Sequence, residues 1–138
     1  MMAAGQAEIV ACVTCGRAEP AADGRPRGEH LLERLREELA RRAGAAVQVS
    51  DVRCLWACQK SCAVMLRSEG RVGYVIVGLE PSEDSARALL DYAQLYLQSN
   101  DGAVPYRSWP APLKGHFHCR IPRATEPGEP EPAKGPSS

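Results

Sequence analysis

Apolar and polar residues alternate in some stretches of the chain and recur with a helical period in others. Residues 7–13 and 46–52 carry β-branched apolar residues in short or alternating runs, which predicts two strands. Between them, the leucines of 29–43 recur three to four positions apart among Glu and Arg, which predicts an amphipathic helix that ends before Gly44. The Gly and Pro residues of 15–28 argue against a helix before residue 29.

A hairpin and a second helix are predicted next. Residues 63–67 and 72–77 have the composition of strands, and Gly70 lies in the turn between them. Pro81 is followed by acidic residues suited to a first helical turn, and an apolar stripe then continues to about residue 98. This β-α-β, β-β-α order predicts a thioredoxin-like α/β domain, with a four-stranded mixed sheet and helices packed on it.

The length of 138 residues predicts one small domain with flanking segments. We expect a disordered N-terminus over 1–6 and the thioredoxin-like domain over 7–100. An extended C-terminal segment packed on that domain is expected over 101–122. Pro, Glu, Gly and Ser dominate 123–138, which predicts a disordered tail.

Charge and composition narrow the possible functions. Seventeen basic residues balance seventeen acidic ones, and no basic stripe with interleaved aromatics appears, so nothing indicates nucleic-acid binding. No apolar run reaches membrane-spanning length and the start has no basic signal region, which predicts a cytoplasmic protein. Six cysteines in a compartment that keeps thiols reduced favour metal or redox chemistry over structural disulfides.

Five of the six cysteines fall into two groups, Cys12 with Cys15 and Cys54 with Cys58 and Cys62. In a β-α-β crossover the two parallel strands end at the same edge of the sheet. Cys12 and Cys54 each follow one of those predicted strands, so we expect the two groups to meet there. A [2Fe–2S] cluster needs four protein ligands, which two such pairs would supply.

The cysteine spacing and the hairpin after it resemble those of thioredoxin-like [2Fe–2S] ferredoxins, over roughly 9–97. The chain is still more similar to an uncharacterised bacterial family labelled "predicted metal-binding protein" (domain of unknown function 1636). The motifs that carry this second resemblance are Val10-Ala11-Cys12-Val13-Thr14-Cys15, the Cys54/Cys58/Cys62 triplet, and Val104-Pro105-Tyr106-Arg107-Ser108-Trp109-Pro110 ahead of Cys119-Arg120-Ile121-Pro122.

The resemblance implies a [2Fe–2S] cluster and one-electron transfer rather than enzymatic catalysis. It implies Cys54 and Cys58 as ligands, with Cys12 next, and it implies a redox partner protein and a homodimer. The fourth ligand departs from the ferredoxins, which carry it about a dozen residues after the first cysteine, where this chain has no cysteine. Cys15 is the favoured replacement, because the loop after it could fold it back toward Cys12, and Cys62 is its rival.

Zinc is the main alternative metal, because Cys12-x-x-Cys15 with Cys54-x-x-x-Cys58 also satisfies a closed site of four thiolates. Such a protein would be a zinc-stabilised interaction module whose working surface is 104–122. A third hypothesis is a dithiol redox protein that uses Cys12 and Cys15. The breakers between Cys15 and the next helix argue against it, since the paired thiols of thioredoxin-type sites open a helix.

The remaining candidate residues lie near the end of the predicted domain. Cys119 is a single thiol beside Arg120, which favours a structural role. His116 and His118 alternate along an extended segment and would face the same way. We interpret them as exposed histidines without a ligand.

Overall fold

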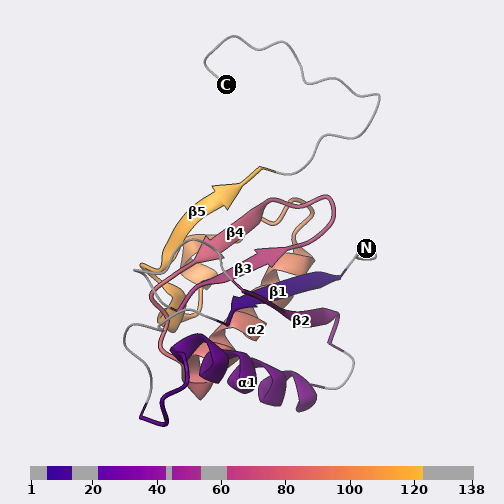
Figure 1. Cartoon of the computed structure of the whole chain (residues 1–138). Helices are drawn as coiled ribbons and strands as arrows, with labels where there is room; N and C mark the ends of the chain where they lie inside the picture. The colour runs from indigo at the N-terminus through magenta and orange to yellow at the C-terminus, as the bar shows by residue number, and fades with distance from the viewer. Residues whose placement is uncertain (1–5, 14–21, 43–44, 54–61, 123–138) are drawn as a thin grey trace.

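The computed structural model describes residues 6–13, 22–42, 45–53 and 62–122, and within them five strands and two α-helices (Figure 1). The strands are β1 (Ala7–Cys12), β2 (Val47–Val52), β3 (Val64–Arg67), β4 (Gly73–Ile76) and β5 (Phe117–Ile121). The α-helices are α1 (Arg27–Ala40) and α2 (Glu83–Gln98), and two 3₁₀ turns follow, η2 (Tyr106–Ser108) and η3 (Ala111–Leu113).

The strands form one mixed sheet in the order β2-β1-β3-β4-β5, in which only the β1–β2 pair is parallel. The predicted α/β class and the β-α-β, β-β-α order are confirmed, but the prediction of four strands is wrong. β5 pairs antiparallel with β4 and adds a fifth strand at the edge. Four of its five residues are exposed, so it lacks the alternation of buried and exposed positions by which a strand is recognised from sequence.

The helix boundaries differ from the predicted ones for local reasons. α1 begins at Arg27, two residues early, because Pro26 occupies the position before the helix and Gly28 fits, buried, into its first turn. α1 ends at Ala40, with Arg41 as its C-cap, rather than at residue 43. α2 begins after Ser82, whose hydroxyl accepts a hydrogen bond from the Ser85 amide at 3.2 Å and caps the helix.

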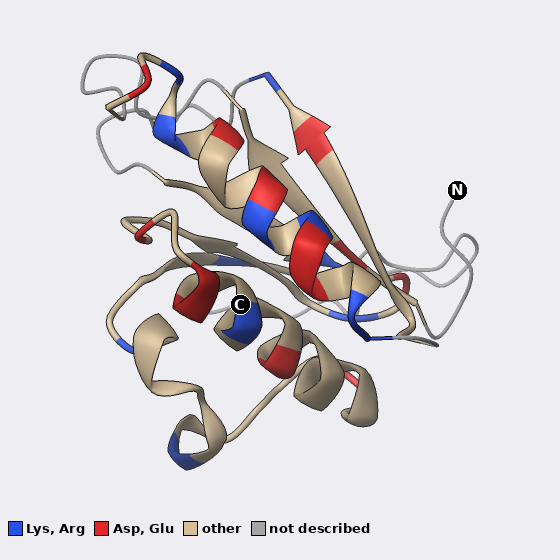
Figure 2. Cartoon of the chain, turned by 90° about the horizontal axis from the view of Figure 1, so that it is seen from below, with Lys and Arg blue, Asp and Glu red and all other residues tan. Residues whose placement is uncertain are grey.

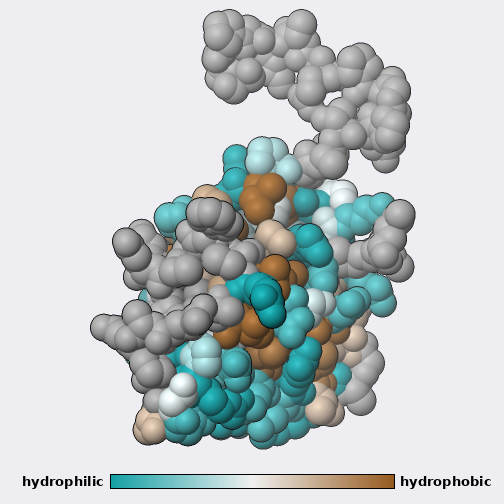
Figure 3. Space-filling view, in the orientation of Figure 1, coloured by the Kyte–Doolittle hydropathy of each residue, from teal (hydrophilic) through white to brown (hydrophobic). Residues whose placement is uncertain are grey.

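Both helices pack on the same face of the sheet, and charged residues cover the outer side of α1 (Figure 2). Alternate residues of each strand point to that face, as in Ala7, Ile9 and Ala11 of β1, and they form the main core with the helices. The other face carries a small apolar cluster of Cys12, Ala63 and Val77. Apolar residues show over the middle of this face, which neither α1 nor α2 covers and which we call the second face (Figure 3).

The sheet has two ends that differ in chemistry. At one end β1 and β2 finish, β3 begins and β4 finishes; we call it the cysteine end, because Cys12 and Cys62 lie there. At the other end the turn between β3 and β4 meets the last turn of α2, and we call it the turn end. No helix in the described part of the chain is long and apolar enough to cross a membrane.

Candidate metal centre

Cys12 is the last residue of β1 and is buried. It lies level with Val52, the last residue of β2, and the Val13 amide donates to the Val52 carbonyl at 2.9 Å. The Cys12 Sγ donates to the carbonyl of Arg53 at 3.6 Å. The thiol therefore contacts the residue that precedes Cys54 in the chain.

The parallel pairing of β1 and β2 produces this contact. Their register runs without a break from Ala7 opposite Val47 to Cys12 opposite Val52, so both strands reach the same edge together. The crossover helix α1 buries Leu31 and Leu35 against the sheet and holds the two strands side by side. The predicted edge is thus present in the structure, with Cys12 on it.

Three of the predicted ligands, Cys15, Cys54 and Cys58, lie outside the described residues. Within the described ranges, no group of three or more His, Cys, Asp or Glu side chains is placed to hold a metal ion. The candidate ligands Cys12 and Cys62 are therefore considered one at a time. Cys12 fits a thiolate-held metal, because a buried sulfur on this edge lies beside the start of the second cysteine group.

Cys62 also lies at the cysteine end, but it belongs to the other face of the sheet. It exchanges two backbone hydrogen bonds with Leu79, of 3.1 and 3.2 Å, just before β3 begins. Its side chain is fully buried in the main core, whereas the next residue, Ala63, packs with Cys12 on the second face. The structure thus separates Cys12 from Cys62 by the alternation of side chains along an extended backbone.

Burial also affects the acidity of the Cys62 thiol. Burial raises the pKa of the Cys62 thiol to about 11, against a smaller opposing effect of the Arg27 guanidinium. The nearby Cys12 and Glu80 raise this pKa further. The Cys62 thiol therefore loses its proton less readily than an ordinary thiol does.

His116, His118 and Cys119 lie at or on the edge strand β5. The expectation that both histidines are exposed is wrong for His116, which is half-buried. Its Nδ1 lies 2.9 Å from the Val77 carbonyl, and the Val77 amide donates to the His116 carbonyl at 2.8 Å. Because a carbonyl only accepts, Nδ1 carries the proton in this contact, and the ring ties β5 to the end of β4.

His118 and Cys119 are exposed on β5, and Cys119 lies opposite Val75. The structure does not bring either residue to the contact between Cys12 and Arg53. Sequence reasoning missed the Arg53 carbonyl and the His116 ring as contacts at the cysteine end. A backbone carbonyl leaves no residue signature, and the partner of His116 could not be found before the fifth strand was known.

Comparison with known proteins adds a family and a fold. Residues 9–123 match the model of the family described as "Protein of unknown function (DUF1636)". None of the curated proteins matches the chain. Among solved structures, the chain is similar to a thioredoxin-like [2Fe–2S] ferredoxin from Aquifex aeolicus, with a TM-score of 0.54 and 12 % sequence identity. The likeness covers 89 % of this chain and 96 % of that one, and at this identity it shows the fold alone.

Proposed function

The chain belongs to the DUF1636 family, whose description gives no function, and we propose that it is a ferredoxin-like one-electron carrier that binds a [2Fe–2S] cluster. The observation that carries the proposal is the buried Cys12 thiol against the Arg53 carbonyl, where two parallel strands end beside the second cysteine group. The thioredoxin-like fold, shared with a solved protein described as a [2Fe–2S] ferredoxin, supports the same conclusion.

The proposed ligands are Cys12, Cys15, Cys54 and Cys58. The position of Cys62 supports Cys15 as the fourth ligand, because Cys62 packs in the main core on the face opposite Cys12. On this assignment Cys62 is a core residue at the start of β3.

A bound [2Fe–2S] cluster would supply one-electron redox chemistry. The residues of the chain would hold it and limit its contact with water. Ala63 and Val77 pack with Cys12, and Val52 and Val75 pack against them, so the described side of the site is apolar. An apolar shell with few polar groups influences the potential of the metal that it surrounds.

An electron carrier acts through partners rather than on a substrate. We therefore propose a redox partner protein, and a homodimer on the likeness to thioredoxin-like ferredoxins alone. A cytoplasmic location remains a prediction from the composition of the chain.

Matched Cys→Ser variants test the ligand assignment. In protein purified without air, Cys12→Ser is expected to lose the visible absorption of the cluster, because a thiolate ligand is removed. Cys119→Ser is the matched control, since Cys119 is exposed on β5, and it is expected to keep that absorption. Full cluster absorption in Cys12→Ser would contradict the assignment.

A further inference from the structure

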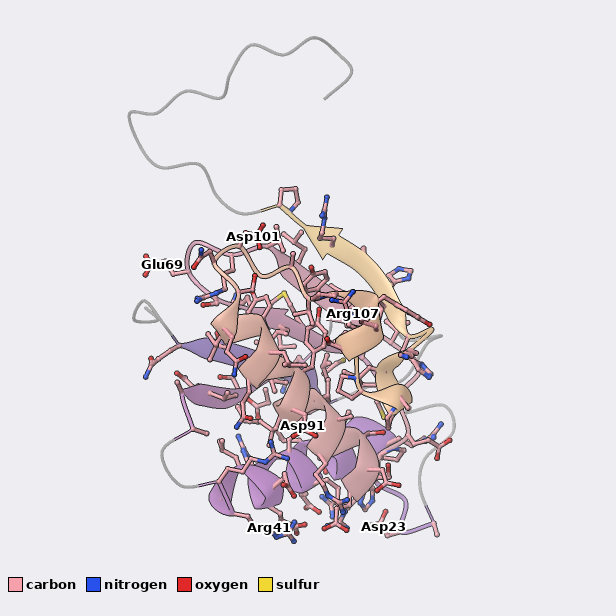
Figure 4. All side chains as sticks on the ribbon, turned by 180° about the vertical axis from the view of Figure 1, so that it is seen from behind. Asp23, Arg41, Glu69, Asp91, Asp101 and Arg107 are labelled. Carbon is pink, nitrogen blue, oxygen red and sulfur yellow. The ribbon has the colours of Figure 1, made fainter. Side chains whose placement is uncertain are left out.

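The segment between α2 and β5 presents aromatic and basic side chains on the surface. Tyr106 is 60 % exposed, and its ring centroid lies 4.9 Å from that of Trp109. The Lys114 Nζ lies over the Tyr106 ring, 4.8 Å from its centroid. Arg107 is exposed on η2, on the side of the molecule where α2 lies (Figure 4). We call these four residues the Tyr106 patch.

The fold holds the Tyr106 patch in place. The Trp109 indole N–H donates to the Val104 carbonyl at 2.8 Å, and the indole packs on Phe117 with ring centroids 4.3 Å apart. The fully buried Leu113 anchors the segment between Trp109 and Lys114. An aromatic surface that is already ordered loses little conformational entropy when it binds a ligand.

The charged side chains of the segment that carries the Tyr106 patch are all basic. Residues 102–122 contain Arg107, Lys114 and Arg120 and no Asp or Glu. Two of these three basic residues belong to the Tyr106 patch. A surface that combines exposed aromatic rings with positive charge fits a ligand that is both acidic and rich in proline.

The chain itself contains such a sequence. Residues 126–132 read Glu-Pro-Gly-Glu-Pro-Glu-Pro, with three Glu, three Pro and no basic residue. Proline-rich sequences favour the polyproline II conformation, which aromatic surfaces bind at low entropic cost. We propose that residues 126–132 bind the Tyr106 patch of the same molecule, with prolines on Tyr106 and Trp109 and glutamates near Arg107 and Lys114.

The length of the chain is compatible with binding in the same molecule. β5 begins at Phe117, which packs on Trp109, and ends at Ile121, so the chain must return by four residue steps, or about 14 Å. A polyproline II segment advances about 3.1 Å per residue, so residues 126–132 begin about 16 Å and end about 34 Å beyond Ile121. Both lengths exceed the return distance, so residues 126–132 are within reach of the Tyr106 patch.

The proposed contact would act as a cover over an exposed aromatic surface. An intramolecular ligand on a short tether has an effective concentration of the order of millimolar, so a weak contact suffices to hold it. The charge pairing makes the contact sensitive to salt. A partner protein that uses the Tyr106 patch would first have to displace residues 126–132. The proposal does not depend on the metal.

The experiment compares full-length variants by the NMR signals of the Trp109 indole N–H and the Tyr106 ring. Glu126→Gln, Glu129→Gln and Glu131→Gln together are expected to shift both signals, and so is high salt in the wild-type protein. These changes lie outside the described fold. Arg107→Glu with Lys114→Glu is expected to abolish the effect of the triple change. In that charge-reversed background, Glu126→Lys, Glu129→Lys and Glu131→Lys together are expected to bring back a salt-sensitive shift of both signals.

Arg36→Glu is the matched control for charge reversal, because Arg36 is exposed on α1, outside the Tyr106 patch. It is expected to leave the effect of the triple change intact. Signals that stay unchanged in the triple Gln variant would overturn the proposal. Signals that move with protein concentration would also overturn it, since they would place the tail of a second molecule on the patch.

Discussion

The two ends of the sheet are held together by different chemistry. At the turn end, side chains bind backbone carbonyls of neighbouring segments. The Tyr96 hydroxyl donates to the Val72 carbonyl at 2.5 Å, and the Arg71 guanidinium donates to the carbonyls of Leu97 and Ser99 at 2.9 Å each. Figure 4 shows Glu69 and Asp101 at this same end. At the cysteine end, the side-chain hydrogen bonds to backbone carbonyls in the described ranges include those of the Cys12 thiol to Arg53 and of the His116 ring to Val77.

The hydrogen bonds at the turn end show how the protein alone closes that end of the sheet. Charged and phenolic donors make strong hydrogen bonds to carbonyls, so they join the hairpin turn to the end of α2. A thiol is a weak donor and contributes little by that route. Under the proposed function, metal binding would join the loops at the cysteine end, as it does in other proteins whose metal sites stabilise the fold.

The sharpest test of the turn end is Gly102→Ala. Gly102 has a φ of +89°, and a Cβ there would lie 2.8 Å from the Tyr96 ring and 3.2 Å from Arg71 Cβ. Backbone strain and overpacking together are expected to lower the free energy of unfolding by about 3 kcal/mol. Denaturant unfolding measures the change.

Gly115→Ala is the matched control for Gly102→Ala. Gly115 lies beside His116 and has a similar φ of +86°, but a Cβ there would meet nothing within 4 Å. Its expected cost is about 1 kcal/mol, from the backbone alone. Equal losses at the two glycines would show that the turn end is no more tightly packed than the loop at Gly115.

A pair of tyrosines separates hydrogen bonding from packing. Tyr96→Phe removes the hydroxyl that binds the Val72 carbonyl and is expected to cost about 1–2 kcal/mol of unfolding free energy. Tyr92→Phe is the control, because the Tyr92 hydroxyl is buried without a well-formed hydrogen bond to any described residue. It is expected to be neutral or slightly stabilising, and a loss as large as that of Tyr96→Phe would refute the distinction.

At the cysteine end, Cys62→Ala tests whether this thiol is part of the core or of the metal site. Removing a fully buried sulfur is expected to cost about 1 kcal/mol in unfolding free energy while the visible absorption of the cluster is retained. Loss of the absorption with little change in stability would make Cys62 a ligand and remove Cys15 from the proposed set.

The smallest expected effect concerns the ion pair of Glu8 and Arg67 on the second face, at the turn end. Burial acts to raise the pKa of Glu8, but hydrogen bonds from Ser50 and Arg67 outweigh it, so this pKa is lowered below its usual 4.5. The pair therefore stabilises the fold above about pH 4.5, and this contribution disappears as the pH falls through the lowered pKa.

Glu8→Gln is accordingly expected to be less stable than the wild type at pH 7 by under about 1 kcal/mol, and this deficit should close below pH 4.5. Glu69→Gln is the control, because Glu69 is exposed in the turn between β3 and β4. A deficit that persists unchanged at pH 3 would show that Glu8 stabilises through packing rather than charge. Unfolding curves at several pH values measure both variants.

The sequence predicted most of the fold because local patterns determine most of its elements. The leucines of α1 recur with the helical period and the inner residues of β1 alternate, so both elements were predicted to within three residues at each end. β5 was missed, because only Phe117 of its five residues is partly buried and its pairing with β4 is a long-range contact. The local sequence pattern carries no information about long-range strand pairing.

The candidate site was predictable in part. The sequence placed Cys12 at the end of β1, and this was enough to predict that Cys12 lies at the edge where the two parallel strands end. The structure confirms that edge. The face on which Cys62 lies depends on the residue at which β3 begins, and spacing alone does not give that register. Cys15, Cys54 and Cys58 lie outside the described residues, so their roles as ligands remain predictions.

The most direct test of the central claim is the iron and acid-labile sulfide content of protein purified without air, together with its visible spectrum. The account predicts about two irons and two sulfides per chain, with absorption bands that bleach on reduction with dithionite. A colourless protein with one zinc per chain, still colourless after attempted cluster reconstitution, would contradict it.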